Sequence, residues 1–184
     1  MSDTTHGAAP RAESPPRYRW WHAAAVGVAA NVVTAGSAGF SGDQTYYNSL
    51  WKPALAPPDW AFPPVWAFNN ATTLWSNLRV ANLPRGTPGR RAALALEAAG
   101  WGSFTVFPQL YFGLRSPVLA AADTALYLAM TTASVAVTAR LDRKAAWALA
   151  PRLAWLALAT YVSTSMALRN RDDFFGREPD APER

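Results

Sequence analysis

Five long apolar stretches dominate the pattern of hydrophobic and polar positions along the chain. They cover residues 20–40, 59–81, 92–112, 117–140 and 145–168, and most charged residues lie outside them. Each stretch holds about 20 residues or more, enough for an α-helix to cross a hydrocarbon core about 30 Å thick. The alternative is a soluble all-α protein with Ala-rich core helices, but five buried helices would need further amphipathic helices to cover them, and the sequence provides none. We therefore predict an all-α fold, an integral membrane bundle of five transmembrane helices.

Polar segments frame these stretches. Both ends of the chain are rich in Pro, Arg, Asp and Glu, a composition typical of disordered tails. We predict a disordered N-terminal tail over residues 1–19, a five-helix membrane domain over 20–168 and a polar, disordered C-terminal tail over 169–184. Because residues 1–19 contain no apolar signal segment, we expect the first stretch to be the first membrane helix.

The distribution of charged residues along the chain indicates its orientation in the membrane. The sequence holds 17 Lys and Arg against 12 Asp and Glu, a net charge of +5. The basic residues gather in the N-terminal tail and in the loops after the second and fourth stretches, which share one side of a five-span protein. The positive-inside rule places that side in the cytoplasm. We predict a bacterial cytoplasmic membrane protein with a cytoplasmic N-terminus, and no nucleic-acid partner.

Proline and tryptophan alternate between residues 46 and 68, around Trp51, Trp60 and Trp66. Proline fixes the backbone, and it is tolerated in the first turn of a helix. Tryptophan favours the membrane–water boundary. This segment is expected to form a stiff aromatic lid, with Trp60 roofing a pocket. For Trp51, an interfacial aromatic belt is an equally open interpretation.

One face of the second stretch is polar. Trp66, Asn70, Thr73 and Asn77 recur at helical spacing and share that face. Amide groups have no partners in lipid, so the face should turn inward. It would then either line a cavity with polar handles or join neighbouring helices by hydrogen bonds, and both interpretations remain open.

Ionisable residues inside the stretches are candidates for function because they are costly in lipid. Glu97 and Arg152 enter from the same side to similar depth, so we hypothesise an ion pair; the alternative is that Arg152 reaches to the interface. For Asp123 we favour a role in helix packing or dimerisation. Asp59 is either an acid in the first turn of a helix or a proton donor that faces the cavity.

Three segments carry a family resemblance. They are Lys52-Pro53 with Pro57 to Trp66, Phe112 to Pro117 with Ala122-Asp123, and Pro151 with Trp155, Ala159-Thr160 and Asn170. In types and spacing they resemble the translocator protein family, also called tryptophan-rich sensory or peripheral-type benzodiazepine receptor proteins. The resemblance implies a five-helix bundle, commonly a homodimer, with a cavity under the first loop. It also implies porphyrins, sterols and aromatic drug-like molecules as ligands.

This chain is a divergent member by that resemblance, because several positions depart from the usual pattern. The positions are Asn70, Gly100, Phe104, Phe107, Arg152, Ser163 and Ala167. Phe104 and Phe107 stand where the family has a polar residue and a tryptophan, and we expect them to protrude into the cavity after a kink at Pro108. The interior should therefore be more apolar than is usual for the family.

The function predicted from these observations is to bind, and to transport or sense, an apolar planar ligand such as a porphyrin or another tetrapyrrole. The predicted ligand-binding residues are Trp51, Trp60, Phe62, Trp66, Asn70, Thr73, Phe104, Phe107, Ala159 and Ser163. We expect no metal and no cofactor; the partners would be a porphyrin, sterol or isoprenoid ligand, the lipid bilayer and a second copy of the chain. The alternative is a membrane enzyme that acts on a tetrapyrrole or an isoprenoid or carotenoid intermediate, with Asp59 or Asp123 as the acid.

Overall fold

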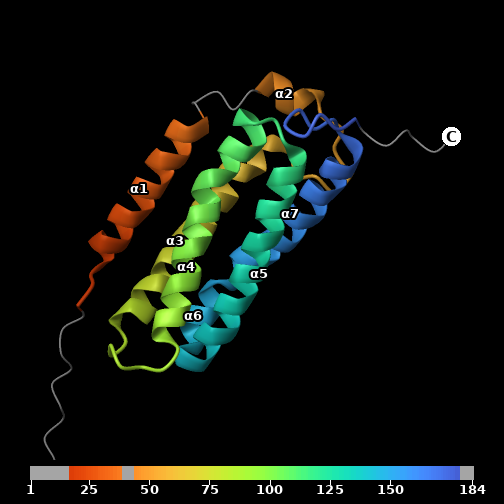
Figure 1. Ribbon diagram of the computed structural model, residues 1–184. Helices are drawn as coiled ribbons and strands as arrows, with labels where there is room; N and C mark the ends of the chain where they lie inside the picture. The colour runs from red at the N-terminus through yellow and green to blue at the C-terminus, as the bar shows by residue number, and fades with distance from the viewer. Residues whose placement is uncertain (1–16, 39–43, 179–184) are drawn as a thin grey trace, which may run out of the picture.

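Five long helices run side by side in the computed structural model, which describes residues 17–38 and 44–178 (Figure 1). They are α1 (Trp20–Ala38), α3 (Phe62–Asn82), α4 (Arg90–Pro108), α5 (Pro117–Leu141) and α7 (Ala150–Arg169). The prediction of an all-α fold is confirmed, since these ranges contain no β-strand. By length and composition, two helical segments of the described chain could cross a membrane, Pro117–Leu141 and Arg143–Arg169.

Short helical segments close the two ends of the bundle. One end carries α2 (Gln44–Ser49), the 3₁₀ turn η1 (Asp59–Ala61) and the π-helix η2 (Gln109–Gly113). The opposite end carries α6 (Arg143–Ala148), as Figure 1 shows. We refer to these as the α2 end and the α6 end of the bundle.

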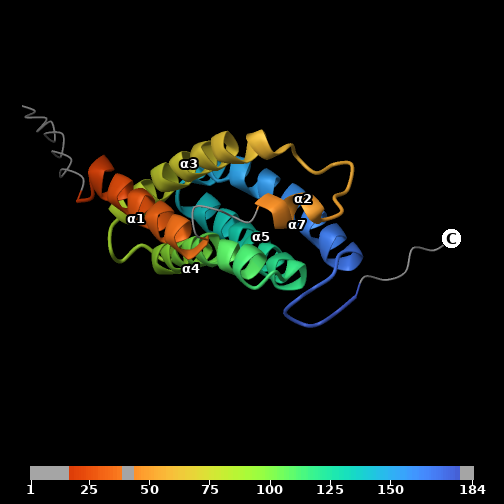
Figure 2. The ribbon, with the colours of Figure 1, turned by 90° about the horizontal axis from the view of Figure 1, so that it is seen from above.

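The helices differ in how much of their surface they bury. α5 makes its most extensive contacts with α7 and α4, whereas α1 packs on the outside against α3 and α4 (Figure 2). Trp20, Val28 and Val32 on α1 are each more than half exposed. An apolar surface of this kind is unusual on a soluble protein and suits contact with lipid.

Local sequence explains where several helices begin. Pro63 and Pro64 fall in the first turn of α3, where a missing N–H loses no partner. Ser116 caps α5 by accepting a hydrogen bond from the Leu119 N–H, and Asp142 caps α6 in the same way. The two loops that lead into α5 and α6 can therefore stay short.

Pro108 marks the end of α4. It stands at the last position of α4, and the chain continues as the π-helix η2 rather than as a regular α-helix. Proline removes a backbone donor and its ring collides with the preceding turn, so the regular hydrogen bond to the Phe104 carbonyl is lost at this position. The wider turn directs Tyr111 into the interior, where it is buried.

Residues 170–178 are folded, so the prediction of a disordered C-terminal tail does not hold for them. Asp172 accepts hydrogen bonds from Ser116 Oγ at 2.7 Å, Val118 N at 3.0 Å and Phe175 N at 3.0 Å. Burial alone would raise the pKa of Asp172, but the hydrogen bonds from Phe175, Ser116 and Val118 outweigh it and lower that pKa. This carboxylate fastens the segment after α7 to the start of α5.

The end of the predicted N-terminal tail is also held in place. The Tyr18 N–H donates to Asn82 Oδ1 at 2.8 Å, and Asn82 Nδ2 donates to the Tyr18 carbonyl at 2.9 Å. This pair of hydrogen bonds ties the start of α1 to the end of α3. The disorder expected for residues 1–16 and 179–184 falls outside the described residues.

Candidate functional site

A cavity of about 440 Å³ lies inside the α2 end of the bundle. Its walls come from α3, α4, η2, α5 and α7, with Thr34 from α1 and with Tyr47, Pro57 and Asp59 from the segment between α1 and α3. A volume of this size falls within the range of about 300–1,000 Å³ typical of small-molecule sites. We call this space the cavity.

Aromatic rings from three helices build one side of the cavity. The Trp66 ring lies 5.2 Å from the Phe104 ring and 6.4 Å from the Trp155 ring, and Phe62 meets Trp155 edge-on at 5.5 Å. Edge-on and tilted contacts of this kind are favourable between aromatic rings. The rings therefore brace one another along this wall.

Tyr47, Pro57 and Asp59 line the mouth of the cavity, and Trp60 does not roof it as expected. Trp60 is 75% exposed and is not among the lining residues. Asp59 does face the cavity, although it also stands in the first turn of η1 as the simpler interpretation expected.

Trp51 anchors the same loop rather than lining the cavity. Its backbone N–H donates to Asn170 Oδ1 at 2.7 Å, and Asn170 Nδ2 donates back to its carbonyl at 2.9 Å. The Arg169 guanidinium lies 4.5 Å above its ring. These contacts hold the loop against the end of α7, far along the sequence from it.

The structure brings together most, but not all, of the predicted site residues. Those that line the cavity are Phe62, Trp66, Phe104, Phe107, Ala159 and Ser163. Asn70 and Thr73 are buried between helices outside the cavity. The α3 lining ends at Trp66, so the polar residues one and two turns further along α3 belong to the packed interior instead.

Five aromatic lining residues were absent from the predicted set, namely Tyr47, Tyr111, Phe112, Tyr127 and Trp155. Helical spacing carried a signal for three of them. Tyr111 follows Phe107 by four residues, Tyr127 follows Asp123 by four, and Trp155 precedes Ala159 by four. Residues four apart share a helix face, so the neighbours of a correctly placed lining residue were candidates as well.

Two carboxylates, Asp59 and Asp123, line the cavity. Asp123 on α5 is hydrogen-bonded to Ser103 on α4. Asp59 is hydrogen-bonded to the hydroxyl of Tyr47; burial, together with the charge and hydrogen bond of Asp59, raises the pKa of Tyr47. Tyr47 therefore remains a neutral phenol and donates to Asp59. Among the residues that the structure describes, no Lys, Arg or His lines the cavity.

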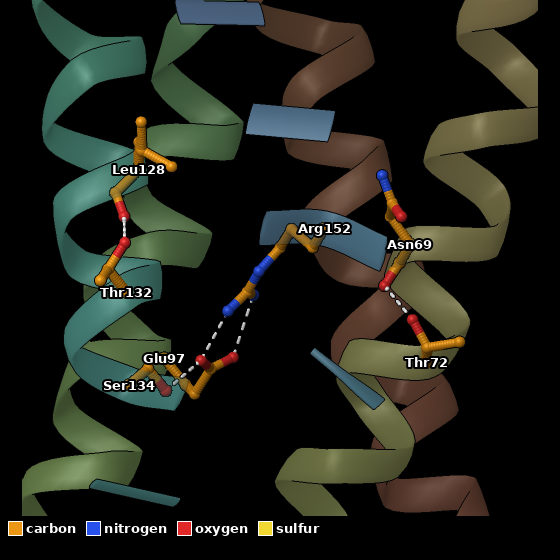
Figure 3. Close-up of polar contacts among 7 residues, drawn as sticks. All are labelled: Asn69, Thr72, Glu97, Leu128, Thr132, Ser134 and Arg152. Atoms are coloured by element: carbon orange, nitrogen blue, oxygen red, sulfur yellow. Dashed lines mark hydrogen bonds and ion pairs between the residues drawn. The ribbon is translucent and has the colours of Figure 1, made fainter. Parts of the chain in front are cut away.

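A buried ion pair lies towards the α6 end, beyond the cavity (Figure 3). Arg152 on α7 donates to Glu97 on α4 through both terminal nitrogens, at 2.6 and 3.0 Å, and Ser134 Oγ on α5 donates to Glu97 Oε1 at 2.6 Å. The hypothesised pair is thus confirmed. The alternative for Arg152 is wrong, because this residue is only 2% exposed and does not reach the interface.

Asn77 on α3 completes the group around Glu97. In the amide orientation that satisfies both neighbours, Asn77 donates to Glu97 Oε2 at 3.0 Å and accepts from Trp101 Nε1 at 3.2 Å. Charged groups in a low-dielectric interior need such partners on every side. We call Asn77, Glu97, Ser134 and Arg152 the polar cluster; it joins α3, α4, α5 and α7.

Tyr127 stands between the cavity and the polar cluster. Its ring lines the cavity, and the Arg152 guanidinium lies 5.4 Å from the ring centre. Gly100 on α4 makes room for this ring, since a Cβ there would fall 2.8 Å from it. A side chain at this position would collide with the ring, which explains a glycine inside a helix.

These features define an all-helical bundle with an aromatic-walled cavity at one end. The TspO/MBR family pattern matches residues 23–169 of the chain, which covers all five long helices apart from the first turn of α1. The chain belongs to the TspO/MBR family. Members of this family are membrane proteins, in agreement with the apolar helices described above.

Characterised relatives share this assignment at modest identity. The chain is 28% identical over 132 residues to the tryptophan-rich protein TspO of Chlorobaculum tepidum, covering 68% of this chain and 79% of that protein. It is 30% identical over 142 residues to the translocator protein of Ovis aries, covering 72% and 79%. It is also 30% identical over 115 residues to the tryptophan-rich sensory protein of Cereibacter sphaeroides, covering 62% and 70%.

Proposed function

We propose that the protein spans the membrane five times and binds an apolar, planar ligand in the cavity. The long helices α1, α3 and α4 have 19 to 21 residues each and run beside the two segments that are apolar enough to cross by themselves. Asn77 on α3 and Glu97 on α4 turn inward to the polar cluster, which suits helices whose outer surface faces lipid. The N-terminus lies in the cytoplasm, in keeping with the basic loops at the α6 end.

The cavity is the observation that carries this proposal. Its rings, from Phe62 to Trp155, present flat apolar faces, and its polar groups are few and placed at defined points. Such a site favours a rigid conjugated ligand, because stacking and apolar burial require little ordering of the bound molecule. A porphyrin or another tetrapyrrole has this shape; a sterol or an isoprenoid would use the same apolar walls without the stacking.

Transport or sensing is the use that the relatives suggest. Their names, translocator protein and tryptophan-rich sensory protein, describe a ligand that is moved or detected. We propose the same for this chain, as a homodimer in a bacterial cytoplasmic membrane. In this proposal a ligand reaches the cavity past the loop between α1 and α3.

A titration with the dimethyl ester of protoporphyrin tests ligand binding. The ligand's fluorescence anisotropy, followed in a nonionic detergent, should rise and saturate with the wild-type protein. Trp66→Ala should weaken binding at least tenfold because it removes a wall of the cavity. Trp60→Ala, which removes an exposed ring of the same type, should change it less than twofold. Equal losses in both variants, or no saturation at all, would refute the proposal.

A membrane enzyme remains the second candidate, since both predicted acids, Asp59 and Asp123, line the cavity. A general acid must lie within hydrogen-bond reach of its substrate, and either carboxyl would do so for a molecule bound there. Product analysis after incubation with tetrapyrrole and carotenoid intermediates checks this function. Turnover that disappears in Asp59→Asn or Asp123→Asn would support it, and binding without any product would leave only the first function.

A further inference from the structure

A half-buried lysine, Lys52, lies beside the mouth of the cavity. Its Nζ is 4.1 Å from the centre of the Tyr47 ring, and Tyr47 is one of the lining residues. The lining itself contains no basic residue from the described part of the chain. Lys52 therefore places a positive charge at the rim, one side chain away from the space that would hold a ligand.

The neighbours of this lysine hold it in position. The residue before it, Trp51, exchanges two hydrogen bonds with Asn170, and the residue after it, Pro53, is buried. The Tyr47 ring below the ammonium group is fixed as well, because it meets the Tyr111 ring edge-on at 6.3 Å. A charged group that is already held in place has little conformational freedom left to lose when a ligand binds to it.

Lys52 has no carboxylate partner within the described ranges. The ion pairs found there join other residues. Asp59 stands at the same mouth, but it is hydrogen-bonded to the Tyr47 hydroxyl and forms no ion pair with Lys52. The face of the Tyr47 ring attracts the ammonium group, yet it accepts no regular hydrogen bond from it. The N–H groups of Lys52 are therefore available to an acceptor on a ligand.

We propose that the ligand of the cavity is a planar ring system with a carboxylate side chain, and that Lys52 binds this carboxylate at the mouth. This inference rests on the proposed function and names the chemical class and the orientation of the ligand. An ionised carboxylate would lose its hydration among the apolar walls, so the ring enters and the carboxylate stays at the rim. The ammonium group of Lys52 donates a charge-assisted hydrogen bond to it there. A porphyrin with free propionate groups has both parts.

Arg169 provides a comparison within the same end of the bundle. Its guanidinium lies 4.5 Å from the centre of the Trp51 ring, so it too is a cation held over an aromatic ring. However, Arg169 is exposed, and Trp51 does not line the cavity. A general attraction between the basic surface and an anionic ligand would involve both cations. A specific contact at the mouth would involve Lys52 alone.

Two probes with one ring system test the contact, protoporphyrin with its free carboxylates and its neutral dimethyl ester. Each is titrated by fluorescence anisotropy against the wild type and Lys52→Met in the same nonionic detergent at neutral pH and low salt. The ratio of the free-acid affinity to the ester affinity is compared between the two proteins, which cancels the different partition of the probes into micelles. This ratio should fall about threefold or more in Lys52→Met. The affinity for the ester should stay within twofold, which also shows that the variant is folded.

Matched variants separate this inference from the function on which it rests. Lys52→Arg keeps the charge and should keep the ratio of the wild type, and Arg169→Met should keep it as well. A smaller fall in Lys52→Met, or an equal fall in Arg169→Met, would overturn the inference, whereas saturable binding of the ester would still support the proposed function. In the wild type alone, added salt should weaken binding of the free acid and not of the ester. If neither probe binds, the proposed function fails and the inference fails with it.

Discussion

The two halves of this bundle use the same four helices, α3, α4, α5 and α7, in opposite ways. At the α2 end, aromatic rings brace one another around about 440 Å³ of space. Towards the α6 end, a bidentate ion pair and its hydrogen-bond partners fill the centre. Tyr127 marks the boundary, with the cavity on one side of its ring and Arg152 on the other.

This contrast suggests a division of labour between stability and ligand binding. Helices in lipid gain no hydrophobic stabilisation from meeting one another, so close packing and hydrogen bonds must hold them together. The polar cluster supplies such contacts among four helices at one level of the bundle. The opposite half can then keep a space that a well-packed interior would not contain.

Breaking the ion pair should have the largest effect. Glu97→Ala leaves Arg152 buried with an uncompensated charge, which we expect to destabilise the protein by about 3–5 kcal/mol. Thermal unfolding in detergent, followed by circular dichroism, measures the change. The double variant Glu97→Leu/Arg152→Met removes both charges and should recover most of the loss. A single variant as stable as the wild type would show that the cluster does not hold the bundle together.

Truncations in the two halves should differ in cost. Leu149, between α6 and α7, is completely buried, and Leu149→Ala should cost about 2–5 kcal/mol by opening a new void. Phe104 already borders a space, so Phe104→Ala should cost less than half as much despite the larger deletion. Thermal unfolding of both variants in detergent measures the two losses of stability. A greater loss for Phe104→Ala would mean that the aromatic wall, not the α6 end, stabilises the fold.

The smallest loss of stability is expected when the hydrogen bonds of Asp172, which hold the segment after α7, are weakened. Asp172→Asn removes a charged acceptor, and we expect a loss of about 1–2 kcal/mol at neutral pH. The hydrogen bonds lower the folded-state pKa of Asp172 below the unfolded value of about 3.9, so its contribution is complete above that pH and is lost as the pH falls further. Unfolding of both proteins between pH 7 and pH 2.5 should show their stabilities converging in acid. A difference that stays constant with pH would contradict this account.

Helix positions could be predicted from the sequence because one quantity, the length of each uninterrupted apolar stretch, determines them. The five stretches coincide with α1, α3, α4 with η2, α5, and α6 with α7 to within a few residues. The Glu97–Arg152 pair was predictable for the same reason, since depth along two helices that begin at the same side follows from residue number and rise. Long regular segments convert sequence distance directly into spatial distance.

The cavity was only partly predictable, because its outline depends on contacts distant in sequence. Trp60 and Asp59 are neighbours in a proline-rich loop, and the course of that loop, held by Asn170, decides which of them faces inward. Asn70 and Thr73 share a helix face with Trp66, but the space ends at the level of Tyr127. The position where the cavity ends depends on how closely Tyr127 approaches α4 at Gly100. The residue pattern of a single helix does not predict this contact between two helices.

Filling the cavity is the most direct test of the account. Ala159→Phe places a ring among the lining residues of α7, and Ala157→Phe places the same ring on the exposed face of that helix. The affinity of each variant for the neutral porphyrin ester is measured beside that of the wild type. We predict at least a tenfold loss for Ala159→Phe and less than a twofold change for Ala157→Phe. Unimpaired binding to a folded Ala159→Phe protein would place the ligand elsewhere and contradict the central claim.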